Sequence, residues 1–221
     1  MRLTETYRPL TVDAFVGLPD AKRIVGQFLR KPESKAFLLI GASGTGKTRM
    51  AEAIARALNG DISHYNFIQV DSQRCNVEAV QDIKNRLAYA PWGSFWVIVV
   101  NEAPEMTAQA QTAFLSLLDA IPERTIIIFT GNGKVKDSVV TFDKGGLELR
   151  FLSRCMVVHF SNYGLNGEGS AFLRRVWESE GGDGEPPDFE RILKDQRNNL
   201  RASLNCLERA LLERGPHDAT A

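Results

Sequence analysis

The sequence predicts an α/β fold of three layers, in which helices cover both faces of a parallel five-stranded sheet and a small helical lid domain follows. Apolar runs of strand length alternate with segments of helical period, which is the pattern of parallel sheets. A glycine-rich loop joins the first of these runs to a helix. We therefore expect a sheet domain over residues 1–160, a helical lid over 161–214 and a disordered tail over 215–221.

The chain is organised around the segment 37–58. Its apolar beginning, Phe-Leu-Leu-Ile, predicts a buried strand, and the apolar spacing after Thr48 predicts a helix. Between them lies Gly-x-x-x-x-Gly-Lys-Thr, whose glycines let backbone N–H groups face a phosphate at the helix N-terminus. Lys47 can reach the outer phosphates, and the Thr48 hydroxyl can ligate Mg²⁺. The motif predicts a nucleoside-triphosphate site; the alternative is a glycine-rich turn that binds nothing.

The remaining elements follow in order along the chain. Apolar runs predict strands over 65–70, 95–100, 125–130 and 156–160. Helical spacing predicts helices over 20–29, 77–87, 108–118, 169–180, 188–195 and 199–213. The stretch 133–149 is polar and contains glycine, which indicates a loop or a hairpin.

The composition limits the classes of function. A formal net charge of zero means that any contact with nucleic acid must come from a local patch. Three scattered cysteines form neither a disulfide framework nor a metal-ligand spacing, which fits a reducing cytosol. Because no apolar run reaches transmembrane length, we expect a soluble, cytoplasmic protein without membrane contact.

Together the motifs resemble the AAA+ ATPases, and among them the small ATPase subunits of sliding-clamp loaders, of the replication factor C type and its phage relatives. The likeness covers about residues 5–212. Five residues are similar to the family's N-terminal box, which lies against the adenine: Tyr7, Arg8, Pro9, Val16 and Gly17. The resemblance implies that the nucleotide is bound by this box and by the glycine loop with its flank: Gly41, Ala42, Ser43, Gly44, Thr45, Gly46, Lys47, Thr48 and Arg49.

The resemblance also implies catalytic roles. Lys47 neutralises phosphate charge, Glu102 polarises the attacking water, and Asn132 holds that water or the γ-phosphate. Arg201 corresponds to the arginine of the lid. Arg154, in the tripeptide Ser-Arg-Cys, reaches the γ-phosphate of a neighbouring subunit, and such an arginine contributes roughly 10³–10⁵ in rate. The alternatives are a strand-end amide for Asn132, a surface ion pair for Arg154 and a solvated helix face for Arg201.

The sequence departs from the family's pattern at Asn101, which stands where the family has an aspartate beside the magnesium. With Thr48 it forms the predicted metal site, but an amide brings no negative charge. Losing a charge-assisted contact costs roughly 1–3 kcal/mol, so we expect Mg²⁺ binding and turnover to fall by about ten- to a hundredfold. The connection from Asn132 to Ser153 is also longer than usual in the family. The sequence after the lid leaves no room for the family's collar domain, so we expect that the AAA+ modules alone hold the oligomer, that another chain provides the collar, or that the chain is truncated.

The resemblance implies a function in DNA replication. Arg74 and Lys84 resemble positions on the family's DNA-facing helix, although solvated surface charges are an equal alternative. We expect a subunit that uses ATP and Mg²⁺ to load a sliding clamp on primer-template DNA, together with other AAA+ subunits. Two alternatives remain open: a weakly catalytic structural subunit of a hetero-oligomer, and a remodeller of another kind, such as a branch-migration motor or a transposition helper.

Overall fold

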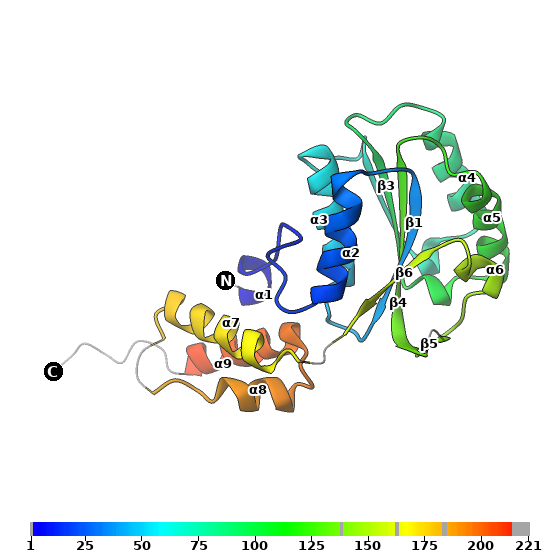
Figure 1. Cartoon of the computed structure of the whole chain (residues 1–221). Coiled ribbons are helices and arrows are strands. Elements are labelled where there is room, and N and C mark those ends of the chain that lie inside the picture. The colour runs from blue at the N-terminus through cyan, green and yellow to red at the C-terminus, as the bar shows by residue number, and fades with distance from the viewer. Residues whose placement is uncertain (1, 138, 162–163, 183–184, 214–221) are drawn as a thin grey trace.

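A parallel sheet forms the centre of the larger part of the protein, and a C-terminal helical unit lies to one side of it (Figure 1). The structure is a computed structural model, and it describes residues 2–137, 139–161, 164–182 and 185–213. Within them, five parallel strands take the order β2–β3–β4–β1–β6, and β5 pairs antiparallel with the end of β4. Their bounds are β1 (Lys35–Gly41), β2 (Phe67–Asp71), β3 (Trp96–Asn101), β4 (Thr125–Lys136), β5 (Val139–Phe142) and β6 (Met156–Phe160). The predicted parallel five-stranded sheet is confirmed, with one antiparallel strand added.

Helices cover both faces of the sheet, so the predicted three layers are also confirmed (Figure 1). One face carries α2 (Pro19–Arg30) and α3 (Lys47–Asn59). The other carries α4 (Val77–Leu87), α5 (Ala108–Asp119) and the short α6 (Leu149–Leu152). Thr107 caps α5: its hydroxyl accepts a hydrogen bond from the backbone N–H of Ala110 at 3.2 Å.

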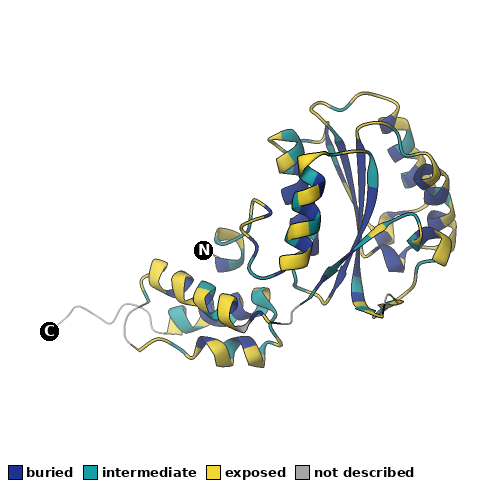
Figure 2. Ribbon diagram, viewed as in Figure 1, coloured by how far each residue is buried: buried dark blue, intermediate teal, exposed yellow. Residues whose placement is uncertain are grey.

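Alternate residues of each strand enter the two apolar cores. In β1, Leu38 packs under α4 and α5, whereas Phe37 and Leu39 pack under α2 and α3. All three side chains are fully buried, and Figure 2 shows the central strands dark blue along most of their length. A strand buried on both faces has no polar face, which is why its sequence reads as a continuous apolar run.

The C-terminal helical unit consists of α7 (Asn166–Ser179), α8 (Phe189–Asp195) and α9 (Leu200–Glu213), which share an apolar core of their own. The short N-terminal helix α1 (Leu3–Thr6), which the sequence did not predict, packs Leu3 into that core. The Leu3 backbone N–H also donates to Glu208 at 3.3 Å. The N-terminal arm is therefore bound to the helical unit; residue 214 and the tail predicted to be disordered lie outside the described residues.

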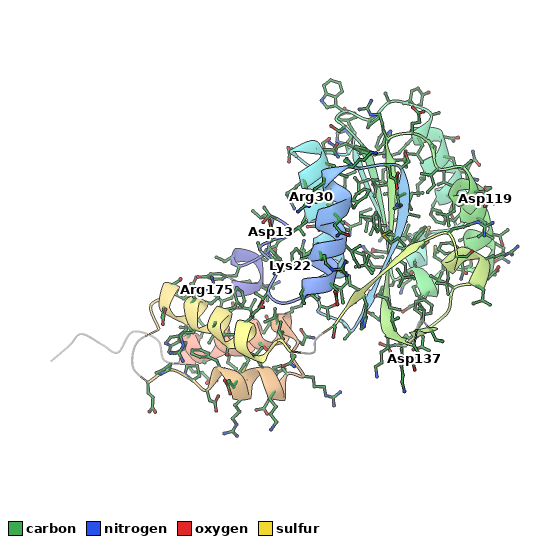
Figure 3. All side chains as sticks on the ribbon, viewed as in Figure 1. Asp13, Lys22, Arg30, Asp119, Asp137 and Arg175 are labelled. Carbon is green, nitrogen blue, oxygen red and sulfur yellow. The ribbon has the colours of Figure 1, made fainter. Side chains whose placement is uncertain are left out.

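The stretch 133–149, predicted to be a loop or a hairpin, contains a hairpin. β4 continues past residue 130 to Lys136, the chain turns at Asp137 with a φ of 48°, and β5 returns (Figure 3). A Cβ on Gly133 would lie 2.1 Å from the carbonyl oxygen of Thr141, so the close pairing requires glycine. The predicted strand was too short because the extension is polar and half-exposed, unlike the buried part of β4.

Candidate functional site

The carboxyl ends of adjacent strands meet at one edge of the sheet. Gly41 lies opposite Asn132 across β1 and β4, and Asp71 lies opposite Asn101 across β2 and β3. A cavity of about 310 Å³ opens at this edge. It is lined by Ser43, Gly44, Gly46, Lys47, Thr48, Arg49, Asp71, Asn101, Glu102, Thr130, Asn132 and Arg201. The structure therefore brings together the glycine loop and most of the predicted catalytic residues.

Lys47 is held at the floor of this cavity. Its Nζ donates to the carbonyl oxygens of Gly41 at 2.9 Å and Ala42 at 2.8 Å, and to Oδ1 of Asn132 at 3.0 Å. Burial lowers the pKa of Lys47 to about 8; the carboxylates of Asp143 and Glu102 oppose this shift, and Arg201 adds to it. The structure thus places the loop lysine in direct contact with Asn132, a contact that the sequence did not predict.

The backbone of the loop requires its glycines. Gly44 and Gly46 have φ angles of +80° and +92°, in the left-handed region that disfavours other residues. A Cβ on Gly46 would lie 2.9 Å from the ring of Phe15. The glycine loop is followed directly by α3, which begins at Lys47, so the N–H groups at the start of that helix face the cavity.

Thr48, Asn101 and Asp71 form a chain of hydrogen bonds. The Thr48 hydroxyl donates to Oδ1 of Asn101 at 3.0 Å, and Nδ2 of Asn101 donates to Oδ1 of Asp71 at 3.1 Å. The two residues predicted to form the metal site are therefore in contact. Asp71 was not predicted as a site residue, although it ends the second strand just as Asn101 ends the third.

Glu102 follows β3 in an unusual backbone conformation. Its φ of 54° and ψ of 40° are left-handed, and its N–H donates to the Thr130 hydroxyl at 3.2 Å. Such a conformation costs of order 1–3 kcal/mol in a non-glycine residue and is frequent at functional sites. The predicted acid is therefore fixed in the cavity by the side chain of a neighbouring strand.

A second cavity, of about 600 Å³, lies between the N-terminal arm, the glycine loop and α9. Four of the five box residues line it: Tyr7, Arg8, Pro9 and Val16. Gly17 is not among its lining residues; its N–H donates to Glu168 at 2.8 Å, and the absence of a Cβ leaves room for Leu165. Gly17 thus contacts the helical unit.

Arg8 and Tyr7 also have structural partners. The Arg8 guanidinium forms an ion pair with the buried Glu52 of α3, which also accepts from Arg49 at 2.9 Å. The Tyr7 hydroxyl donates to Glu180 at 2.8 Å, next to the end of α7. These contacts attach the arm to both neighbouring parts of the molecule, which the sequence did not predict.

The helical unit contacts the glycine loop directly. Arg201 lines both cavities, and Nδ2 of Asn199 donates to the carbonyl oxygen of Ser43 at 3.1 Å. Position 44 must be glycine partly for this reason, since a Cβ there would lie 2.3 Å from Oδ1 of Asn199. The start of α9 therefore rests on the loop.

Arg154 lies outside both cavities. It forms an ion pair with Asp119 at the end of α5 and donates to the carbonyl oxygen of Arg150. Figure 3 shows Asp119 on the side of the molecule away from the C-terminal helical unit. The alternative interpretation of Arg154 as an ion-pair residue thus describes its contacts within one chain, and a role toward a neighbouring chain stays a prediction.

The predicted nucleic-acid residues lie away from the cavities. Arg74 is exposed and ends a 3₁₀ turn (Ser72–Arg74) before α4. Lys84 lies in the second half of α4, and its Nζ donates to the Ser116 hydroxyl at 2.6 Å. DNA contact by these residues remains a prediction.

Comparison with known proteins identifies the sheet domain. The profile of the family described as AAA, "ATPase family associated with various cellular activities", matches residues 37–143. Those residues form an AAA domain. They include the glycine loop, Glu102 and Asn132, and they end at Asp143, next to the hairpin.

The curated relatives of this chain include replication factor C small subunits. One from Halobacterium salinarum is 26% identical over 93% of this chain and 62% of its own length. Another, from Methanocella arvoryzae, is 28% identical over 94% of this chain and 62% of its own. The chain thus spans about three fifths of the length of the curated relatives it matches.

Solved structures agree on the fold. The RuvB Holliday junction branch migration motor of Thermotoga maritima superposes with a TM-score of 0.70 at 18% identity, covering 94% of this chain and 66% of that chain. A DNA polymerase III γ subunit-related protein from the same organism gives a TM-score of 0.60 at 17% identity, covering 86% and 57%. In the described residues, no helix is both long and apolar enough to cross a lipid bilayer.

The donor groups of the smaller cavity fit a nucleotide with Mg²⁺. A hydroxyl, an amide oxygen and two carboxylates are the oxygen ligands that hard cations prefer. The described part of the chain contains no group of three or more His, Cys, Asp or Glu residues placed to hold a metal by themselves. A magnesium ion here would therefore depend on phosphate oxygens for part of its coordination.

The pKa of Lys47 predicts how nucleotide affinity depends on pH. With a pKa of about 8, Lys47 loses its proton as the pH rises through 8, whereas a bound polyphosphate favours the protonated form. Affinity should therefore fall above pH 8, by up to about tenfold per pH unit. Calorimetric titration at pH 9 in two buffers of different ionisation enthalpy should show uptake of close to one proton per nucleotide.

Lys47→Arg is the matched variant, because its guanidinium stays charged throughout this range. Its affinity, though lower, should be nearly independent of pH between 8 and 9.5. An equal slope in Lys47→Arg and the parent chain would show that another group is responsible.

Proposed function

We propose that this chain is an ATP-binding and ATP-hydrolysing motor subunit of a clamp-loader-type complex, which places a ring-shaped clamp on primer-template DNA. The observation that carries the proposal is the contact of Lys47 with Asn132, beside that of Thr48 with Asn101, at one sheet edge. The similarity to replication factor C small subunits over more than nine tenths of the chain supports the choice of complex.

The two cavities suggest how ATP is divided between them. The larger cavity, lined by Tyr7 and Val16, is the proposed nucleoside site, and the smaller cavity with Lys47 is the triphosphate site. Gly44, Gly46 and Arg49 line both, so the glycine loop joins one to the other. Phosphoryl transfer needs positioning and charge neutralisation more than covalent chemistry.

Within the smaller cavity each group has a proposed role. Lys47 stabilises the charge of the β- and γ-phosphates, and Glu102 orients and polarises the water that attacks the γ-phosphorus. Asn132 holds that water or the phosphate, and Arg201 links the position of α9 to the phosphates. Thr48 and Asn101 hold Mg²⁺, which when bound neutralises phosphate charge. Because Asn101 is neutral, hydrolysis is expected to be slow.

Assembly would complete the site. Arg154 is outside the cavities of its own chain, where it is a third exposed and paired only with surface groups. We assign it to the γ-phosphate of a neighbouring chain, so that an isolated chain binds ATP and hydrolyses it poorly. The neighbouring chains are other AAA+ subunits, identical or different.

The test of the proposed function is ATP turnover by the chain with its co-purified subunits, measured with primed DNA, with the clamp and with both. We expect turnover to rise only when both are present and to vanish in Lys47→Ala. Tight ATP binding without turnover in any assembly would instead support a structural subunit. Stimulation by DNA without a clamp would support another kind of remodeller, and failure to bind adenine nucleotide would overturn the proposal.

Arg154→Ala should leave ATP affinity unchanged and reduce turnover of the assembled complex by about 10³-fold or more. Arg150→Ala is the matched control, because Arg150 lies on α6 and pairs with Glu148. Mixing Arg154→Ala with Glu102→Gln in one self-assembled oligomer should restore part of the turnover, since some interfaces then join an intact Glu102 to an intact Arg154. Equal losses in Arg150→Ala and Arg154→Ala would contradict the assignment.

Arg74→Ala should weaken DNA binding equally on all sequences and reduce the slope of log affinity against log salt concentration by about 1, as expected for one lost phosphate contact. Lys84→Ala should act in the same direction. Fluorescence anisotropy at several salt concentrations measures both. Arg30→Ala, at the end of α2 across the sheet, is the control (Figure 3); an equal effect there would indicate nonspecific charge.

A further inference from the structure

We propose that Asp71 supplies the negative charge of the magnesium shell that Asn101 lacks, so that the acidic group lies one strand further along the sheet. The inference rests on the proposed function, since it concerns the metal that accompanies ATP. It assigns a positioning role to Asp71, which belongs neither to the glycine loop nor to the segment that follows β3.

Strand register places Asp71 beside the site. Asp71 ends β2, Asn101 ends β3, and the two are direct partners across this parallel pair. Both side chains line the smaller cavity together with Thr48. A side chain at this position therefore faces the same space as the one predicted to meet the metal.

Two hydrogen bonds fix the orientation of the Asn101 amide. Its oxygen accepts from the Thr48 hydroxyl at 3.0 Å, which leaves the lone pairs of Thr48 Oγ1 free for a cation. Its nitrogen donates to Asp71 at 3.1 Å. The amide dipole therefore presents its negative end toward Thr48 and its positive end to the carboxylate, which is the orientation that favours a cation beside Thr48.

Without Asp71 this orientation would lose its support. The NH₂ group of Asn101 would have no acceptor at this position, and the amide could turn its positive end toward the metal. With Asp71 present, the charge of the carboxylate polarises the amide through the hydrogen bond. Coulomb attraction also falls only inversely with distance, so a carboxylate beyond one amide still attracts a divalent cation.

Glu102 is the other nearby acid, but it does not replace Asp71. Its backbone is held in the left-handed conformation by Thr130, on the side of β3 that faces β4. Asp71 approaches Asn101 from β2, on the opposite side. The two carboxylates therefore flank the cavity from different strands, which leaves Glu102 for the water and Asp71 for the metal shell.

The decisive experiment is a titration of metal affinity that does not require turnover. Chain saturated with a non-hydrolysable ATP analogue is titrated with Mn²⁺, and the free ion is followed by electron paramagnetic resonance. Asp71→Asn should raise the Mn²⁺ dissociation constant by about 10–100-fold, the usual effect of losing a group that orients a metal ligand. Affinity for the analogue in EDTA should stay unchanged.

The reciprocal variant, Asp71→Asn with Asn101→Asp, keeps one amide and one carboxylate in contact. It should restore Mn²⁺ affinity to within a few-fold of the parent chain. Asp82→Asn is the control, because it makes the same change of charge on the exposed surface of α4. It should have no effect.

Three results would overturn the inference. The first is an unchanged Mn²⁺ dissociation constant in Asp71→Asn; the second is an equal rise in Asp82→Asn. The third is a reciprocal variant that binds the analogue in EDTA yet still binds Mn²⁺ weakly, and this variant decides the matter if Asp71→Asn alone fails to fold. Failure of the proposed function is distinguishable, since the parent chain would then not bind the analogue in EDTA.

Discussion

The candidate site depends on the register of four parallel strands. The carboxyl ends of parallel strands lie along one edge of the sheet, and here the ends of β2, β3, β4 and β1 place Asp71, Asn101, Asn132 and Gly41 in a row along that edge. Asn132 lies two residues past the level of Asn101, because Val100 pairs with Phe129. A shift of one residue in any pair would turn a side chain of this row to the opposite face of the sheet. The apolar cores on both faces fix the register, so packing far from the cavity determines its chemistry.

Beside this row, the amine of Lys47 is held by three hydrogen-bond acceptors. Two carbonyls of its own loop and the amide oxygen of Asn132 accept its hydrogen bonds, yet burial still lowers its pKa to about 8. The electrostatic interaction of a buried, poorly hydrated cation with a bound anion is stronger than that of a cation in bulk water. The amine of Lys47 is thus already positioned in the cavity, and little reorganisation is needed when a phosphate binds. Such preorganisation favours charge neutralisation.

Periodicity and motif were sufficient to predict the sheet and its layers, and they left a loop or a hairpin as the alternatives for 133–149. They missed features that depend on pairing between distant segments. Asp71 needed the register of β2 and β3, and Asp143 comes near Lys47 only because the hairpin returns the chain to Asn132. The helix α1 is too short to have a period, and its Leu3 is buried by α7–α9 rather than by its own neighbours.

The position of the larger cavity has a mechanical consequence. Its walls come from the N-terminal arm, the glycine loop and α9, three segments distant in sequence. The arm is joined to the helical unit by Leu3 in the apolar core of that unit and by the hydrogen bond from Tyr7 to Glu180, and the unit contacts the loop through the hydrogen bond from Asn199 to Ser43. The contact of Asn199 with Ser43 is a hydrogen bond between surfaces, whereas the sheet and the helical unit each have a packed apolar core. A ligand that contacts all three walls would therefore bias the angle between two rigid bodies, because the bonds that set this angle are weak beside the cores that carry them.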